Sequence, residues 1–138
     1  MISHRATSLL CLAAALVSTG CVRTNATAPK TYAVKGKVVY NDGTPMTSGF
    51  IEFQSVKHPG LRINAEIKKD GAFTLETLVD GQRLRGGPEG EHKVTITPML
   101  TGDQTSQPDL KPIVLPKTYT IKAEDDNDLT ITVEKPKR

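Results

Sequence analysis

The residues Lys69–Leu75, with the sequence KDGAFTL, decide the fold of the chain. Asp70-Gly71 is a tight-turn signal, because glycine adopts a positive φ without a steric penalty. After this turn, Phe73 and Leu75 project from one face of a strand and their neighbours from the other. Before it, apolar and polar residues alternate over 62–68. The pattern predicts an antiparallel hairpin of two half-buried strands whose apolar rows both face a core.

Alternating segments recur along the rest of the chain and predict an all-β domain. Turn signals separate them, and no segment shows helical periodicity. The glycine-rich residues 79–91 are expected to be a long loop. Residues 113–115 lie between prolines, which cannot donate to a ladder, so they are expected at a sheet edge. A seven-stranded antiparallel β-sandwich accommodates these segments. The remaining strands are expected within 34–40, 51–54, 92–97, 119–121 and 129–134.

The composition restricts the classes of function. The 138 residues include no Trp, three Phe and three Tyr, so the core must consist mainly of Val, Ile and Leu. The net charge of +3 comes from Lys and Arg scattered among Asp and Glu, unlike the basic stripe of a nucleic-acid-binding protein. The glycine-rich segment lacks the lysine and the following helix of a phosphate-binding loop. We therefore expect no nucleic-acid partner and no cofactor.

The N-terminal residues are typical of an export signal. A short positive region at His4 and Arg5 precedes an apolar run over 9–17. This run is shorter than the roughly 20 residues of a membrane span, but it fits a signal-peptide core. We expect residues 1–20 to be a signal peptide, residues 21–32 a flexible tether, and residues 33–136 the β-sandwich domain.

Cys21 directly follows the small residues 18–20, and this arrangement resembles the lipobox of bacterial lipoproteins. Ser18 stands where a lipobox usually has an aliphatic residue. The resemblance implies that the signal is cut before Cys21 and that Cys21 carries palmitate-type acyl chains. Ordinary signal cleavage and an uncleaved anchor are the alternatives. Cys11 would leave with the signal, so the mature chain could form no internal disulfide.

Three motifs of the predicted domain resemble carboxypeptidase regulatory-like domains. They are Val34–Val38 with the turn Asp42–Pro45, the segment Asp70–Leu75, and the segment Glu89–Ile96. The last has His92 where the family usually has Tyr. The resemblance covers 33–135 and is to lipoproteins of the kind abundant in planctomycete-type bacteria. It implies a transthyretin-like (immunoglobulin-like) sandwich of about seven strands, and a non-catalytic module.

Two polar segments hold candidate ligand-binding residues. Arg83 and Arg85, two residues apart, are a candidate contact for an anion. An acidic turn before the last strand is a candidate calcium site, because calcium prefers carboxylate oxygens. It lacks the glycine and the distal glutamate of an EF-hand loop. Its residues are Glu124, Asp125, Asp126 and Asp128.

His92 is expected to point into the core rather than to bind a metal, since no second His or Cys lies at ligand spacing. No nucleophile elbow is present, so the protein is not expected to be an enzyme. The predicted function is that of a membrane-anchored cell-envelope lipoprotein, acting as a structural or interaction module toward an envelope protein or polymer. Val22 after Cys21 implies the outer membrane by resemblance to lipoprotein sorting rules. The alternatives are a carbohydrate- or peptidoglycan-binding module, which the low aromatic content disfavours, and an accessory calcium-binding domain.

Overall fold

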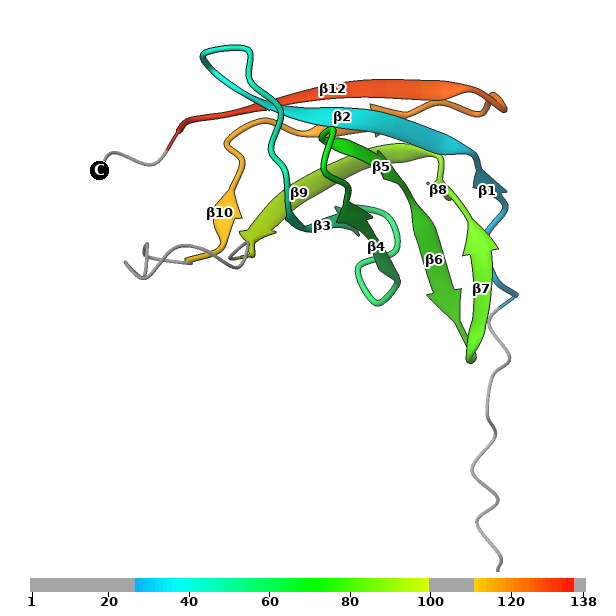
Figure 1. Cartoon of the computed structure of the whole chain (residues 1–138). Coiled ribbons are helices and arrows are strands. Elements are labelled where there is room, and N and C mark those ends of the chain that lie inside the picture. The colour runs from blue at the N-terminus through cyan, green and yellow to red at the C-terminus, as the bar shows by residue number, and fades with distance from the viewer. Residues whose placement is uncertain (1–26, 100–110, 136–138) are drawn as a thin grey trace, which may run out of the picture.

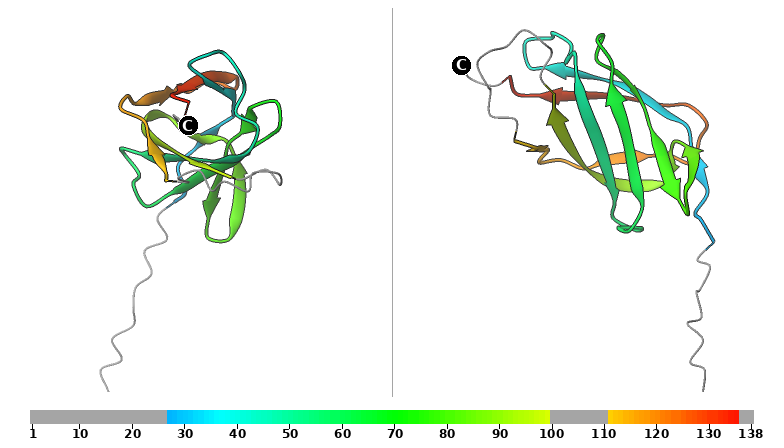
Figure 2. Two further views of the ribbon diagram at one scale, coloured as in Figure 1. Left: turned by 60° about the vertical axis from the view of Figure 1, so that its left-hand side comes forward. Right: turned by 60° about the horizontal axis from the view of Figure 1, so that its bottom comes forward.

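Every regular element of the described residues, 27–99 and 111–135, is a β-strand in the computed structural model of the chain. Two sheets face each other and enclose an apolar core, so the predicted β-sandwich is confirmed (Figure 1). Figure 2 shows the two layers from two further sides. The predicted signal peptide and Cys21 lie outside the described residues. No helix in the described ranges is long and apolar enough to cross a membrane.

The smaller sheet has three strands in the order β12-β2-β5. Its centre is β2 (Val34–Tyr40), which pairs antiparallel with β5 (Ala72–Thr74). On its other side β2 pairs with β12 (Asn127–Val133) in parallel, with Asn127 opposite Val34 and Val133 opposite Tyr40. The sandwich is therefore not antiparallel throughout, because the last strand runs in the same direction as β2.

The larger sheet contains seven strands, with β10, β9, β3, β4, β6 and β7 in spatial order and β11 on β9 beside β10. A two-stranded ribbon of β1 and β8 lies next to it. The ribbon begins at Thr31, within the range predicted as tether. The bounds are β1 Thr31–Tyr32, β3 Gly49–Ser55, β4 Arg62–Ile67, β6 Glu76–Val79, β7 Gln82–Arg85, β8 Gly87–Pro88, β9 Gly90–Pro98, β10 Ile113–Val114 and β11 Tyr119–Ile121.

The predicted hairpin at residues 69–75 is wrong in its pairing. The Asp70-Gly71 turn forms, with Gly71 at φ +80°. The Gly71 amide donates to the Lys68 carbonyl (2.8 Å), and the Lys68 amide donates to the Ala72 carbonyl (2.9 Å). Beyond these bonds the arms separate, because β5 pairs with β2 in the other sheet. At Leu75 the chain crosses back: its amide donates to Val34 and its carbonyl accepts from Gly86. The residues after it form β6, which pairs with β4.

Gly36 makes this crossing sterically feasible. It lies directly opposite Phe73 in the β2–β5 pair. A Cβ atom on Gly36 would lie 2.7 Å from the Phe73 ring and would also overlap the Leu129 carbonyl. A close approach of this kind is a usual role of glycine inside a strand. Phe73 and Leu75 are buried as expected, and the Phe73 ring lies 6.2 Å from that of Phe53 on the larger sheet.

The expectation of a long loop over 79–91 is also wrong. The chain forms β7 and β8 there, and β7 pairs with β6 through a two-residue turn at Asp80-Gly81. Both turn residues have positive φ, +48° at Asp80 and +79° at Gly81. Such a turn has the twist that joins two antiparallel strands tightly. Its Asp-Gly signal was present in the sequence, but the other glycines obscured it.

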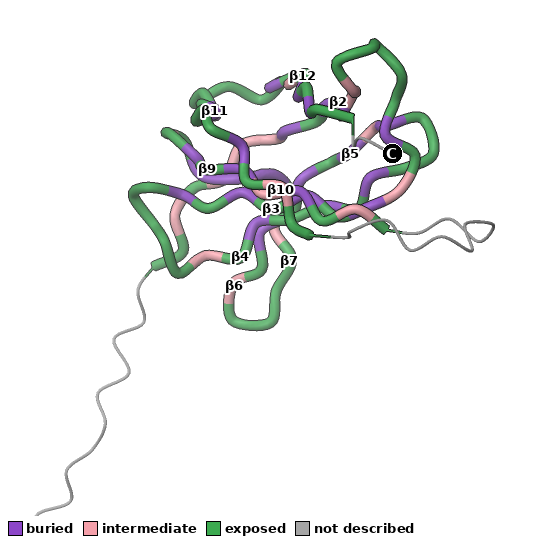
Figure 3. The backbone as a smooth tube through the Cα atoms, turned by 90° about the vertical axis from the view of Figure 1, so that its left-hand side faces the viewer, coloured by how far each residue is buried: buried purple, intermediate pink, exposed green. Residues whose placement is uncertain are grey.

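The core lies between the two sheets and consists mainly of aliphatic side chains, as the composition predicts. Figure 3 shows buried segments alternating with exposed ones along the strands, while most of the turns are exposed. The fully buried side chains of largest volume include Phe53, Phe73, Met46, Ile51, Ile63, Ile67, Leu75, Ile96, Ile121 and Ile131.

Candidate functional sites

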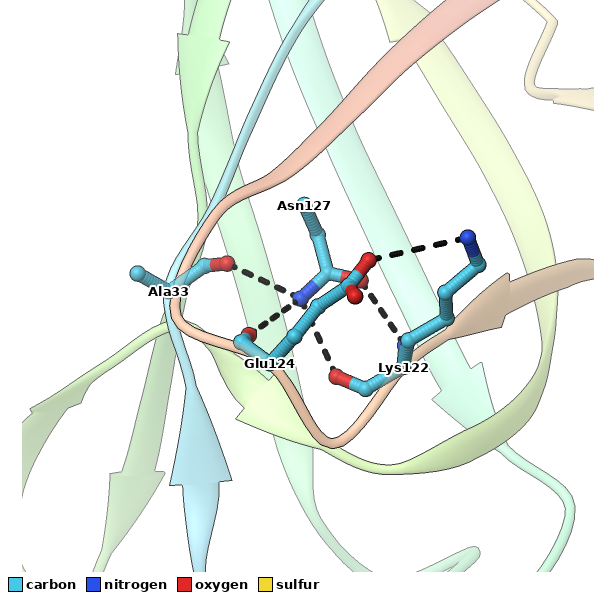
Figure 4. A network of polar contacts seen from close by, with 4 residues as sticks. All are labelled: Ala33, Lys122, Glu124 and Asn127. Atoms are coloured by element: carbon cyan, nitrogen blue, oxygen red, sulfur yellow. Dashed lines mark hydrogen bonds and ion pairs between the residues drawn. The ribbon is translucent and has the colours of Figure 1, made fainter.

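The acidic turn between β11 and β12 is organised by a buried amide, Asn127. Its Oδ1 accepts from the backbone amide of Lys122 (2.8 Å). Its Nδ2 donates to the carbonyls of Ala33 (3.2 Å), Lys122 (3.1 Å) and Glu124 (2.8 Å) (Figure 4). The Asn127 side chain therefore fixes the turn and ties it to the start of β2. Sequence reasoning missed this role, although a single Asn inside an acidic run was a visible signal.

The four carboxylates of this turn are not gathered into one site. Glu124 contacts Lys122 (3.6 Å) and Asp126 contacts Lys35 on β2 (2.8 Å). Asp128 is exposed on β12. Within residues 27–99 and 111–135, no group of three or more His, Cys, Asp or Glu side chains is placed to hold a metal ion. Calcium binding stays a prediction, and the arrangement of Asn127 accounts for the turn without it.

Arg83 and Arg85 both lie on β7 and not on a loop, and their surroundings differ. Arg83 forms an exposed ion pair with Glu76 on the neighbouring strand (3.2 Å). Arg85 lines a small recess of about 120 Å³ at the start of β2, beside Thr74, where the chain leaves β5 for the larger sheet. The structure therefore brings only one of the two arginines to a concave surface.

The recess joins the two predicted sites, since residues of the acidic turn form its other wall. Asp125 and Asp126 face it together with Lys35, Thr74 and Arg85. The hydrogen bond and charge of Asp126 raise the pKa of Lys35, and nearby Arg85 opposes this effect. Ligand pockets usually measure about 300–1,000 Å³, so the recess suits only a small charged group. Its two basic and two acidic side chains fit a small zwitterionic group.

His92 is buried on β9, as predicted from its position in the strand. Its Nδ1 lies 2.9 Å from the Gly90 carbonyl, and its ring centroid lies 6.0 Å from that of Phe53. Burial lowers the pKa of His92, because the core disfavours the charged imidazolium. Among the described residues, the His92 Nε2 and the hydroxyl of Tyr119 on the adjacent strand are buried without a hydrogen-bond partner. His92 is therefore a neutral core residue.

The outer face of the larger sheet carries a polar row across five strands. The cross-strand registers place one polar side chain from each of β9, β3, β4, β6 and β7 next to that of the neighbouring strand. At the usual strand spacing of about 4.8 Å, the row is roughly 19 Å long. One end of this face adds exposed apolar side chains, Phe50 and Val114. The row consists of Thr95, Glu52, Asn64, Glu76 and Arg85.

No protein-family model, no curated protein and no solved structure matches the chain.

Proposed function

We propose that the protein is an exported lipoprotein, held on a cell-envelope membrane through Cys21, whose β-sandwich is a non-catalytic structural or interaction module. The main support for this proposal is the position of Cys21 after an apolar run of signal-peptide length and three small residues. Two acyl chains on one residue suffice for stable anchoring. The outer membrane is the proposed location, since Val22 rather than an acidic residue follows Cys21.

The short tether supports a role close to the membrane surface. The first strand begins at Thr31, ten residues after Cys21. Even a fully extended tether of that length spans only about 35 Å. A domain held this way meets other envelope components through its sheet edges and loops, at a high local concentration of neighbours on the same membrane. The proposed partner is therefore another protein or polymer of the envelope.

Two matched cysteine variants test the anchor. Cys21→Ser should move the protein from the membrane fraction to the soluble fraction, because it removes the acylated thiol. Cys11→Ser is the control and should leave the protein in the membrane fraction, since Cys11 departs with the signal. Membrane retention of Cys21→Ser would contradict lipid anchoring and would favour an uncleaved signal as the anchor.

A polysaccharide or peptidoglycan ligand is the second candidate, and the polar row on the larger sheet favours it. Carboxylate, amide and guanidinium groups along one line can exchange hydrogen bonds with successive sugar hydroxyls. Co-sedimentation with purified peptidoglycan tests this candidate. We expect Asn64→Ala to weaken binding, whereas Thr130→Ala on the other sheet should not. Equal binding by wild type and both variants would remove the row as the contact site.

A further inference from the structure

The side edges of the two sheets differ in how well they are protected against pairing with another strand. β5 has three residues, β10 has two between prolines, and β7 has four with two arginines. Short strands, prolines and charges are the usual ways to block an edge. β12 has seven residues without Pro, Lys or Arg, and Asp128 near its start is its one charged residue. In the described part of the chain its only strand partner is β2.

The hydrogen-bond pattern shows which backbone groups of β12 face away from β2. The Asn127 amide donates to the Ala33 carbonyl (3.2 Å), and the Val133 carbonyl accepts from the Asn41 amide (2.9 Å). Backbone direction alternates along a strand, so residues 127, 129, 131 and 133 face β2. Asp128, Thr130 and Thr132 consequently direct their N–H and C=O groups to the free edge. Their side chains are exposed.

We propose that this free edge of β12 pairs antiparallel with β12 of a second copy of the chain. With Thr130 on the two-fold axis, Asp128 of each copy lies opposite Thr132 of the other. All three residues then form hydrogen-bonded pairs, and two bonds per pair give about six backbone hydrogen bonds. The two smaller sheets join into one continuous sheet. This inference names the partner of the interaction module proposed above, but the pairing itself does not depend on the lipid.

Charge complementarity selects a second copy in antiparallel orientation. Residues 124–128, before and at the start of β12, carry four carboxylates. Residues 134–138, after the strand, carry one carboxylate and three basic side chains, so the sequence is acidic before β12 and basic after it. Antiparallel pairing brings the acidic end of each copy toward the basic end of the other, whereas parallel pairing brings like charges together.

The symmetry of this pair is compatible with two copies on one membrane. A two-fold axis between antiparallel edge strands runs perpendicular to their sheet, so both larger sheets lie on the same side of the joined sheet. β1, where the described chain enters the sandwich, pairs with β8 and adjoins β7 of the larger sheet (Figure 1). The N-terminal ends of both copies therefore leave on the same side, as a shared anchor plane requires.

Native mass spectrometry of the full-length protein, expressed in cells and released from detergent micelles, tests the proposal. We expect a dimer at micromolar concentration for wild type and a monomer for Thr130→Lys, because an edge lysine blocks strand pairing. Thr74→Lys is the matched control: it places the same charge on an exposed threonine at the other edge of the same sheet, and it should remain dimeric. A wild-type monomer, or a Thr130→Lys dimer, would overturn the proposal.

A second measurement guards against a folding defect in the lysine variant. Backbone amides of Asp128, Thr130 and Thr132 should exchange with solvent faster in Thr130→Lys than in wild type, while amides of β3 keep their protection. Equal exchange at these three amides in both proteins would overturn the pairing. The subunit mass also reports lipid on Cys21. A dimer without lipid would support the β12 pairing and refute the lipid anchor, whereas a lipidated monomer would support the anchor and overturn the pairing.

Discussion

Two Asp-Gly pairs ten residues apart, Asp70-Gly71 and Asp80-Gly81, fold into different structures. Both glycines have nearly the same φ, +80° and +79°. The second pair closes a two-residue hairpin within the larger sheet, while the first carries the chain from the larger sheet to the smaller one. The turn signal thus determines that the chain reverses, and the residues after it determine which sheet receives the next strand.

Burial explains the difference between the two turns. After Gly71 comes Phe73, a fully buried ring that faces Phe53 across the core. After Gly81 the strand is mostly exposed, and its Arg83 pairs with Glu76 at the surface. A sandwich closes only if some strand crosses between the sheets, and the strand with the larger apolar side chains gains more from doing so.

The largest expected effect comes from removing the ring that drives the crossing. Phe73→Ala should destabilise the domain by about 3–5 kcal/mol, because it leaves a cavity between the sheets. Leu84→Ala on β7 is the control and should cost less than about 1 kcal/mol, since Leu84 is only half-buried. Urea unfolding monitored by circular dichroism measures both values. Equal losses would contradict the claim that burial distinguishes the two turns.

Exchanging each turn glycine for alanine separates backbone strain from packing. Both substitutions place a side chain at positive φ, which costs about 1–2 kcal/mol. A Cβ on Gly71 would also lie 2.6 Å from the Val38 carbonyl, whereas at Gly81 nothing lies within 4 Å. Gly71→Ala should therefore cost about 1–3 kcal/mol more than Gly81→Ala, as is usual for overpacking. Thermal unfolding of the pair tests this, and matching melting temperatures would refute it.

Lowering the pH should destabilise the domain through His92, which is buried in the core. Burial lowers the pKa of His92, so the unfolded chain binds a proton that the folded domain resists. Above pH 6.5, the approximate pKa of an unfolded histidine, His92 is neutral in both states and does not reduce stability. Below that pH the free energy of unfolding falls by at most about 1.4 kcal/mol per pH unit. His92→Phe should flatten the pH dependence between 6.5 and 5. An unchanged slope in this variant would exclude His92 as its source.

The smallest effect is expected at the exposed hairpin. Arg83→Ala removes an ion pair between two exposed side chains, Arg83 and Glu76. Such pairs contribute about 0–1 kcal/mol at most, and salt screens them. Urea unfolding should show a small decrease in the free energy of unfolding at low salt, near the lower end of this range. The decrease should disappear at high salt. A loss above 2 kcal/mol that persists in salt would indicate that the hairpin contributes to the core.

Sequence patterns predicted most of the strands, because period-two alternation records which side chains face the core. Phe73, Leu75 and His92 were placed correctly for this reason. The crossing at Leu75 and the parallel pairing of β12 depend on contacts between residues far apart in the chain, which no local pattern encodes. The role of Asn127 was missed because its three acceptor carbonyls come from two segments that meet only in the folded domain.

The candidate sites were predicted less well than the fold. Arg85 and Asp125 were singled out as parts of separate sites, and the structure brings both to one recess. Arg83 was assigned to the same anion contact as Arg85, but it pairs with Glu76 instead. Spacing along the sequence indicates which residues share a strand face, but the partners on neighbouring strands decide which side chains stay available to a ligand.

We propose that Cys21 carries the membrane anchor, and the mass of the mature N-terminus decides whether it does. The protein purified from membranes should yield an N-terminal peptide that begins at Cys21 and carries acyl chains on its sulfur. A peptide that begins at Cys21 with a free thiol, or one that begins at any other residue, would refute lipid anchoring through Cys21.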